Sequence, residues 1–459
     1  FGGGVSGEVG RHGTQQLGAH IGGDNGVFDY GLFGNAYETD GFNSRTTDTD
    51  PGDKDGYENN TLHGRIGWQI SEDWRTEIVG HAVDGDNDYD DCFTVDTFAP
   101  TNRCSDDFTQ DSWRGLVEQR GERFSNLLAY SQSKSEREFF SEGKTSWSSE
   151  GELDKAEYTG SWTGSDQLRL VYGAELITES LDNPDGDSER DQKAYYLEYQ
   201  GELTSDFFLT AGIRHDDNDD FGSRTTYRVS AAYVIPLEDG DFKLKATYGT
   251  GFRAPSLYEI AYNNGPFAAP PASGTELDAE ESEGYDFGVA YYANSGWYLE
   301  AIYFDQRIED EIFFDLVAFS GYLQEDGESE SRGVELIGEW PMAYDFALSG
   351  NYTYNDTENA EGLPRLRVPE QLANVGLSYR PWEGRLDIHL FLRVSRDAVD
   401  GGGVELDDYE VLNLTASYRL LESLEIYARV ENLTDEDYQE VPTFNTSGRA
   451  GYAGLRFTF

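Results

Sequence analysis

Apolar and polar residues alternate along many stretches of this chain, and this two-residue period is the feature that most constrains its fold. Between residues 385 and 396 every second residue is apolar: Leu386, Ile388, Leu390, Leu392 and Val394. The pattern recurs over 168–176, 227–235, 411–420 and 424–431. Successive side chains of a strand point to opposite faces of a sheet, so the period predicts strands with one apolar and one polar face.

The connections between these strands alternate in length. Ten short turns are expected near residues 24–26, 71–73, 121–122, 164–166, 204–206, 236–240, 294–296, 341–344, 381–384 and 421–423. Eleven longer Asp/Gly-rich loops are expected near 11–14, 40–58, 86–106, 135–152, 179–191, 216–223, 253–278, 310–325, 355–366, 397–408 and 432–447. This alternation predicts an all-β fold, a 22-stranded antiparallel transmembrane β-barrel with short periplasmic turns and long extracellular loops.

The amino-acid composition argues against several other classes of protein. The chain has 88 acidic and 34 basic residues, a formal charge of −54, which argues against nucleic-acid binding. Aromatic residues make up 14% of the chain, which argues against disorder. A soluble multi-domain β-protein would also show alternation. The hydrophobic content of 37% is too low for several soluble cores, however, and favours the barrel.

The chain has two cysteines, Cys92 and Cys104, within one Asp-rich stretch. An isolated pair in a polar loop predicts a disulfide formed in an oxidising compartment. A metal site is the alternative, but the stretch has no Cys-x-x-Cys motif and no nearby histidine.

Two neighbouring loops are rich in carboxylates. Closely spaced carboxylates suit calcium, which takes 6–8 oxygen ligands. The candidate metal ligands are Asp182, Asp185, Asp187, Asp191, Asp216 and Asp217. The alternative is a solvated acidic surface in a very acidic chain.

The loop at 253–278 is different, because it combines aromatic and amide side chains. Such groups on an outward loop can contact a bulky ligand. The candidate ligand-binding residues are Phe252, Tyr258, Tyr262, Asn263 and Phe267. The alternative is a loop that packs on itself.

No enzyme motif is evident. The chain has no Gly-x-Ser-x-Gly, no P-loop and no dinucleotide fingerprint. Its six histidines are scattered, and His63 and His81 lie on adjacent predicted strands where they would line the lumen. We therefore expect no enzymatic activity.

The last residues form a predicted strand with aromatic residues on one face. Gly454, Phe457 and Phe459 resemble the sorting signal that the barrel-assembly machinery reads in outer-membrane proteins. An ordinary final strand with an interfacial aromatic residue is compatible with the same pattern.

Several longer segments resemble one family, the TonB-dependent outer-membrane receptors. They are 248–259, 276–284, 331–336, 431–438 and the closing 448–457. The compact barrel and the segment 214–222 are most similar to the cobalamin (vitamin B12) receptor group.

The resemblance implies an active transporter in the outer membrane of a Gram-negative bacterium. Its implied ligand is small but bulky, with cobalamin first and a ferric siderophore as the alternative. Calcium orders loops in the cobalamin group, which supports the metal prediction. Implied partners are outer-membrane lipid, lipopolysaccharide and the barrel-assembly machinery, and we expect a monomer.

Family members carry an N-terminal plug domain that contacts TonB. Here the first strand is expected to begin by Gly3, so residues 1–459 are assigned to the barrel and no plug is expected in this chain. We expect the plug to have been cut away or to be a separate chain. A plug-less, porin-like passive pore is the alternative function.

Overall fold

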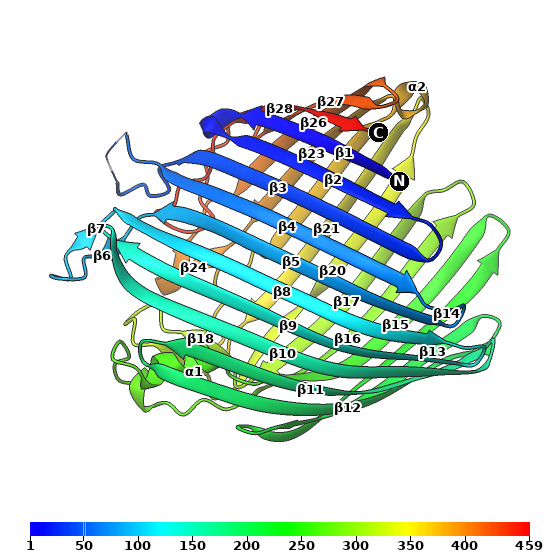
Figure 1. Cartoon of the computed structure of the whole chain (residues 1–459), viewed down its shortest axis with the longest axis horizontal. Helices are drawn as coiled ribbons and strands as arrows, with labels where there is room; N and C mark the ends of the chain where they lie inside the picture. Colours follow the sequence, from blue (N-terminus) through cyan, green and yellow to red (C-terminus); the bar gives the residue numbers. More distant parts are fainter. Residues whose placement is uncertain (49, 51) are drawn as a thin grey trace.

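The chain closes into one antiparallel β-barrel (Figure 1). The computed structural model describes residues 1–48, 50 and 52–459. In the main sheet of 22 strands each strand pairs with the next, and β1 pairs with β28 to close the wall. The barrel strands are β1 (Gly2–Gly10), β2 (Gln15–Asp24), β3 (Phe28–Phe42), β4 (Asp55–Gln69), β5 (Trp74–Tyr89), β8 (Cys104–Arg120), β9 (Phe124–Ser141), β10 (Lys144–Ser165), β11 (Leu168–Asn183), β12 (Gly186–Thr204), β13 (Phe207–Asn218), β14 (Gly222–Leu237), β15 (Gly240–Arg253), β16 (Glu280–Ala293), β17 (Tyr298–Glu309), β20 (Glu328–Pro341), β21 (Phe346–Glu358), β22 (Gln371–Tyr379), β23 (Leu386–Arg396), β26 (Tyr409–Leu421), β27 (Leu424–Glu431) and β28 (Ala450–Thr458). The predicted strand number and pairing are confirmed.

The alternation of side chains separates an apolar outer face from a polar inner face. Ile66 of β4 and Ile78 of β5 are register partners, and they are 65% and 62% exposed on the outside. On the other face of the same strands, Arg65 forms ion pairs with Asp29 and Glu77 at 3.0 and 3.2 Å. The polar groups of the wall therefore satisfy one another inside the barrel, and the apolar groups remain outside.

Short turns lie at one end of the barrel, as predicted. They include the turn between β4 and β5 and the four-residue α2 (Pro381–Gly384) between β22 and β23. The other end, on the left in Figure 1, carries the additional structure. This loop end holds α1 (Leu257–Asn264), the short hairpins β6 (Cys92–Phe93) with β7 (Pro100–Thr101) and β18 (Ile312–Phe314) with β19 (Tyr322–Gln324), and the pair β24 (Val399–Asp400) with β25 (Val404–Glu405). Three short 3₁₀ turns, η1 (Arg11–Gly13), η2 (Ala272–Gly274) and η3 (Gly401–Gly403), also lie in these connections.

Two predicted long loops are wrong. Residues 135–152 and 179–191 continue as strands to tight turns, Glu142–Gly143 between β9 and β10 and Pro184–Asp185 between β11 and β12. These hairpin ends are mostly polar on both faces, with a few aromatic residues such as Phe139 and Trp147, so hydropathy gives no clear alternation there. In the predicted loop 40–58, residues 49 and 51 lie outside the described residues, and strands β3 and β4 take up both ends of the range.

Among the described residues, no helix is long and apolar enough to cross a membrane.

The chain ends meet where the wall closes. The Gly3 N–H donates to the Phe459 carbonyl at 3.0 Å, and the Phe459 N–H donates to the Gly3 carbonyl at 2.9 Å. Phe457 and Phe459 lie on the outer face, while a side chain added at Gly454 would overlap the ring of Tyr427. The glycine is thus needed for close packing in the closing strand.

Candidate functional site

The connection between β15 and β16 folds across the mouth of the barrel at the loop end. It leaves β15 but contacts β12 and β11, which lie three and four strands away in the wall. Arg190 of β12 is 6% exposed and donates to the carbonyl of Pro255 at 2.8 Å. This bond holds the start of the loop against the inner wall.

Helix α1 begins at a capping box in this loop. The Glu259 N–H donates to the Ser256 hydroxyl at 3.1 Å, and the Ser256 N–H donates to the Glu259 carboxylate at 2.6 Å. These bonds satisfy backbone donors that a helix start otherwise leaves open. Arg253 adds ion pairs to Glu259 and Glu280 at 3.0 and 2.6 Å, which fix the helix to the ends of both neighbouring strands.

The helix presents two tyrosines to a group of aromatic rings that we call the aromatic mouth cluster. Its members are Tyr258, Tyr262, Phe314, Tyr322 and Trp147. Tyr262 packs edge-on against Phe314 and Tyr322 with ring centroids 5.6 and 5.7 Å apart. Tyr258 reaches Trp147 of β10 at 5.9 Å and is 40% exposed. The cluster therefore joins three separate segments of the mouth and keeps one ring accessible.

Asn263 fixes this arrangement rather than facing outward. Its amide nitrogen donates to the Tyr322 carbonyl at 2.8 Å, and its Oδ1 accepts the Tyr322 N–H at 2.9 Å. The residue is 6% exposed. A ligand would reach the Asn263 amide only by displacing these two bonds.

The remaining predicted ligand residues lie apart from the cluster. Phe252 shares a face of β15 with Tyr248, whose register partner Val229 is on the outer wall. Phe267 follows α1 and is 59% exposed. The structure thus brings together Tyr258, Tyr262 and Asn263, and it adds Trp147, Phe314 and Tyr322, which sequence reasoning missed because they come from distant segments.

The six aspartates predicted as metal ligands are spread over two faces and a turn. Asp182, Asp187, Asp191 and Asp217 lie on the outer face of β11, β12 and β13, whereas Asp216 faces inward and Asp185 is in the turn. Asp216 is 1% exposed and accepts hydrogen bonds from Arg214 and Gln192, both at 3.0 Å. Calcium at these residues stays a prediction.

A different group of carboxylates converges at the same end of the barrel. One carboxylate oxygen from each of Asp48, Asp53 and Asp90 lies within 4.8 Å of the others, and we call this group the aspartate triad. It combines the β3–β4 connection with the residue that follows β5. Sequence reasoning missed it, although both segments are Asp-rich and were predicted as long loops.

Asp90 is the buried member of the triad. It is 9% exposed, and neither of its carboxylate oxygens has a hydrogen-bond partner among the described residues. Burial, followed by repulsion from Asp55, Asp53 and Asp48, raises the pKa of Asp90 to about 7. A buried carboxylate without a partner is costly, so the triad has the properties of a cation site.

The two other members interact with each other. A hydrogen bond to Asp48 raises the pKa of Asp53, with burial as the next cause. The backbone N–H of Asp50 lowers the pKa of Asp48, with the hydrogen bond from Asp53 as the next cause. A divalent cation would remove the repulsion that these oxygens share.

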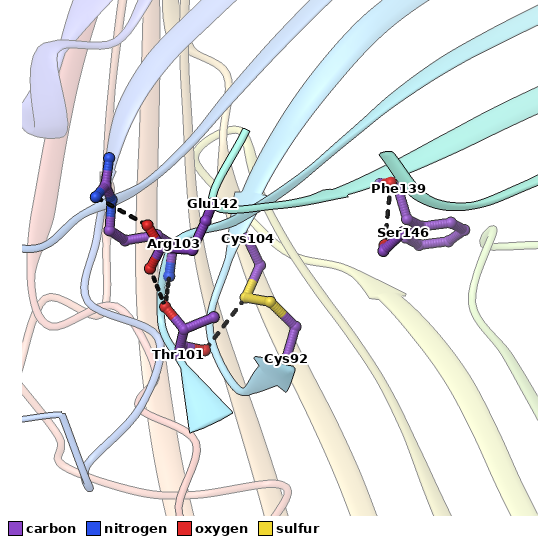
Figure 2. The surroundings of a disulfide bond; sticks show 7 residues. All are labelled: Cys92, Thr101, Arg103, Cys104, Phe139, Glu142 and Ser146. Atoms are coloured by element: carbon purple, nitrogen blue, oxygen red, sulfur yellow. Dashed lines mark hydrogen bonds and ion pairs between the residues drawn. A yellow bond between two sulfur atoms is a disulfide. The ribbon is translucent and has the colours of Figure 1, made fainter. Parts of the chain in front are cut away.

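The predicted disulfide between Cys92 and Cys104 is present in the structure, close in sequence to Asp90 of the triad, and Figure 2 shows its surroundings. Cys92 and Cys104 are bonded across the base of the β6–β7 hairpin, two residues after Asp90. The turn between β9 and β10 supports this hairpin, because Glu142 accepts a hydrogen bond from Thr101 at 2.7 Å and pairs with Arg103 at 2.9 Å. The covalent bond therefore fixes the segment that carries the buried carboxylate.

Comparison with known proteins assigns this closed barrel to a known family. Residues 6–433 match the family model "TonB dependent receptor-like, beta-barrel". The chain belongs to this family, and it is an outer-membrane protein of a Gram-negative bacterium.

Two curated relatives are named vitamin B12 transporter BtuB. The one from Photobacterium profundum is 25% identical over 98% of this chain and 73% of its own length. The one from Vibrio cholerae is 23% identical over 89% of this chain and 65% of its own length. The chain thus spans about two thirds to three quarters of these relatives.

Solved structures share the fold. The siderophore receptor PirA from Pseudomonas aeruginosa superposes on 100% of this chain and 80% of its own, with a TM-score of 0.76 and 20% sequence identity.

Proposed function

We propose that this chain is the barrel of a TonB-dependent transporter that captures a scarce, bulky nutrient, with a cobalamin-like ligand as the first candidate. The observation that carries the proposal is the family match together with the aromatic mouth cluster at the loop end. The similarity to two vitamin B12 transporters supports this ligand class. Transport would depend on TonB acting through a plug domain.

The mouth suits a large ligand with an extended hydrophobic surface. Tyr258 offers a partly exposed ring whose position is fixed from behind by Trp147 and Tyr262. A pre-positioned aromatic group gives contact area at small entropic cost. No enzymatic step is part of this proposal, because capture requires affinity and transport requires TonB rather than chemical conversion of the ligand.

We also propose that calcium binds at the aspartate triad. Asp48, Asp53 and Asp90 would supply oxygen ligands, and water would complete the shell. The ion would tie the β3–β4 connection to the end of β5 and so order one side of the mouth.

The ligand proposal is tested by measuring binding of cyanocobalamin to the detergent-solubilised protein by equilibrium dialysis. Replacing Tyr258 by alanine is expected to weaken binding about two- to tenfold, since an aromatic contact contributes about 0.5–1.5 kcal/mol. Phe98→Ala is the matched control, because Phe98 is 71% exposed at the same end but outside the cluster. Equal affinities of Tyr258→Ala and the unmodified protein would show that the aromatic mouth cluster does not contribute to ligand binding.

A ferric siderophore is the second candidate, because solved siderophore receptors share this barrel. Binding of ferric enterobactin with no binding of cyanocobalamin in the same assay would favour it. The third candidate, a passive pore, requires large ungated conductance of the protein expressed from its complete gene.

A further inference from the structure

Two imidazole rings oppose each other on the wall of the barrel. His63 of β4 and His81 of β5 are register partners in this antiparallel pair. Their ring centroids are 6.0 Å apart, and the ring planes are inclined by 58°. Residues directly opposite each other on adjacent antiparallel strands are the nearest side-chain neighbours across the two strands.

The pair faces the lumen. His63 alternates with Leu62, which is 53% exposed on the outer face, and shares its own face with Arg65. Arg65 is engaged by Asp29 and Glu77 on the inner wall. Both imidazoles are half-buried on the lumenal face of the barrel wall.

Neither ring has a hydrogen-bond or ion-pair partner in the part of the chain that the structure describes. This differs from three other histidines: His12 contacts Ser447, His215 contacts Thr225, and His389 contacts Ser378 and Asp387. The ring nitrogens of the lumenal pair thus remain available as ligands.

The neighbours of the pair do not favour a hard cation. Phe33 lies opposite His63 on β3, and Ser112 lies opposite His81 on β8. Along the strands, Thr61 and Val83 follow at the next lumenal positions. Two neutral nitrogen donors without an adjacent carboxylate select borderline ions such as Zn²⁺, Ni²⁺ or Cu²⁺ over Ca²⁺.

We propose that His63 and His81 form a two-imidazole site for a divalent transition-metal ion on the lumenal wall. Two imidazoles bound to one tetrahedral zinc ion at about 2.0–2.1 Å have centroids about 5 Å apart. The observed separation of 6.0 Å is close to this value, so a rotation of the side chains brings both nitrogens onto one ion. The remaining coordination positions face the lumen and take water.

The test is a calorimetric titration of the detergent-solubilised protein with Zn²⁺ in excess Ca²⁺, which occupies the many carboxylates. We expect one zinc ion per chain that His63→Gln and His81→Gln each weaken by at least about tenfold. His20→Gln is the matched control, since His20 lies on the same face of the wall with Phe33 between it and His63. Its zinc affinity is expected to equal that of the unmodified protein.

Two results would overturn the site. One is unchanged zinc binding in both His63→Gln and His81→Gln, and the other is an equal loss in His20→Gln. A second measurement needs no variant: zinc is expected to protect His63 and His81 together, but not His20, from diethyl pyrocarbonate, as read by peptide mass spectrometry. Modification of His63 and His81 at the same rate with and without zinc would contradict the proposal. Neither result bears on cobalamin uptake, because the site is independent of the aromatic mouth cluster.

Discussion

At the scale of single residues, the most informative one is Asp90, a buried carboxylate that no hydrogen-bond donor among the described residues compensates. It is buried, its oxygens lack hydrogen-bond partners, and three further carboxylates raise its pKa. If calcium binds the triad as proposed, this residue should destabilise the calcium-free protein and stabilise the calcium-bound one. Asp90 therefore offers a direct test of the proposed calcium site.

Replacing Asp90 by asparagine is expected to remove this dependence. In chelator the variant should be more stable than the unmodified protein by about 1–3 kcal/mol, because an unpartnered buried charge is removed. Calcium should raise the thermal unfolding midpoint of the unmodified protein and leave that of Asp90→Asn unchanged. Thermal unfolding in detergent, with calcium or chelator, measures both effects.

Asp408→Asn is the control for this experiment. Asp408 is exposed in the connection before β26, outside the triad and the other candidate metal ligands, and accepts the Asp397 N–H at 3.0 Å. Its response to calcium should match that of the unmodified protein. A full calcium response in Asp90→Asn would exclude the triad as the binding site.

The residues of the candidate site show what a sequence can predict at this scale. The aromatic content of 253–278 singled out Tyr258 and Tyr262, which the structure brings together in one cluster, while their role in ligand binding stays a prediction. It could not predict that Asn263 would bond to the backbone of Tyr322, 59 residues later. Contacts between loops depend on the closed barrel, which local patterns do not encode.

At the scale of elements, the β6–β7 hairpin is a short unit that depends on a covalent bond. Its two strands have two residues each, too few for independent stability. The disulfide between Cys92 and Cys104 and the contacts of Glu142 hold it against the barrel. Asp90 lies two residues before this hairpin. The position of the hairpin therefore also affects the position of Asp90 in the aspartate triad.

Replacing both cysteines by serine is expected to loosen this element and leave the barrel intact. Closing a loop of about 15 residues contributes about 3 kcal/mol in the chain-entropy model. We expect new protease cleavage within 90–103 and a calcium affinity about tenfold weaker, measured by limited proteolysis and calorimetry. Unchanged calcium affinity in the double-serine variant would show that the hairpin does not position Asp90.

The closing strand β28 is the second element with a separable role. Its backbone pairs with β1 and β27, while Phe457 and Phe459 project from its outer face. Phe459→Ala keeps the backbone bonds to Gly3, so the folded barrel should retain its stability. If the aromatic residue is the assembly signal, the amount of folded protein in the outer membrane should fall severalfold, while refolding in detergent should be normal.

Heat-modified mobility on gels distinguishes folded from unfolded barrel in both settings. Phe267→Ala, in an exposed loop, is the control and should assemble normally. Equal assembly of Phe459→Ala and the control would leave Phe459 as an ordinary interfacial residue.

At the scale of the whole molecule, the sequence predicted the architecture better than the ends of its hairpins. Period-two alternation is strong wherever one face meets lipid, as at Ile66 and Ile78, and it led to the correct strand number. The ends of β9–β10 and β11–β12 extend beyond the apolar band, where both faces are mostly polar. There, pairing between strands determines the structure, and the predicted loops were wrong.

The net charge of −54 is a second property of the whole chain. The chain has few basic residues, and many of them form ion pairs with carboxylates of the barrel, as Arg65 does with Asp29. The remaining carboxylates make the surface attractive to divalent cations and repulsive to anions. An uncharged or metal-bound ligand at the mouth is therefore more compatible with this surface than a free anion.

The central claim is TonB-dependent capture and uptake of a cobalamin-like nutrient. The most direct measurement is uptake of radiolabelled cyanocobalamin by cells that lack their own cobalamin receptor and express the complete gene for this barrel, compared with and without TonB. We expect saturable uptake that disappears when TonB is removed. Uptake that persists without TonB, or none when TonB is present and the folded barrel is in the outer membrane, would contradict it.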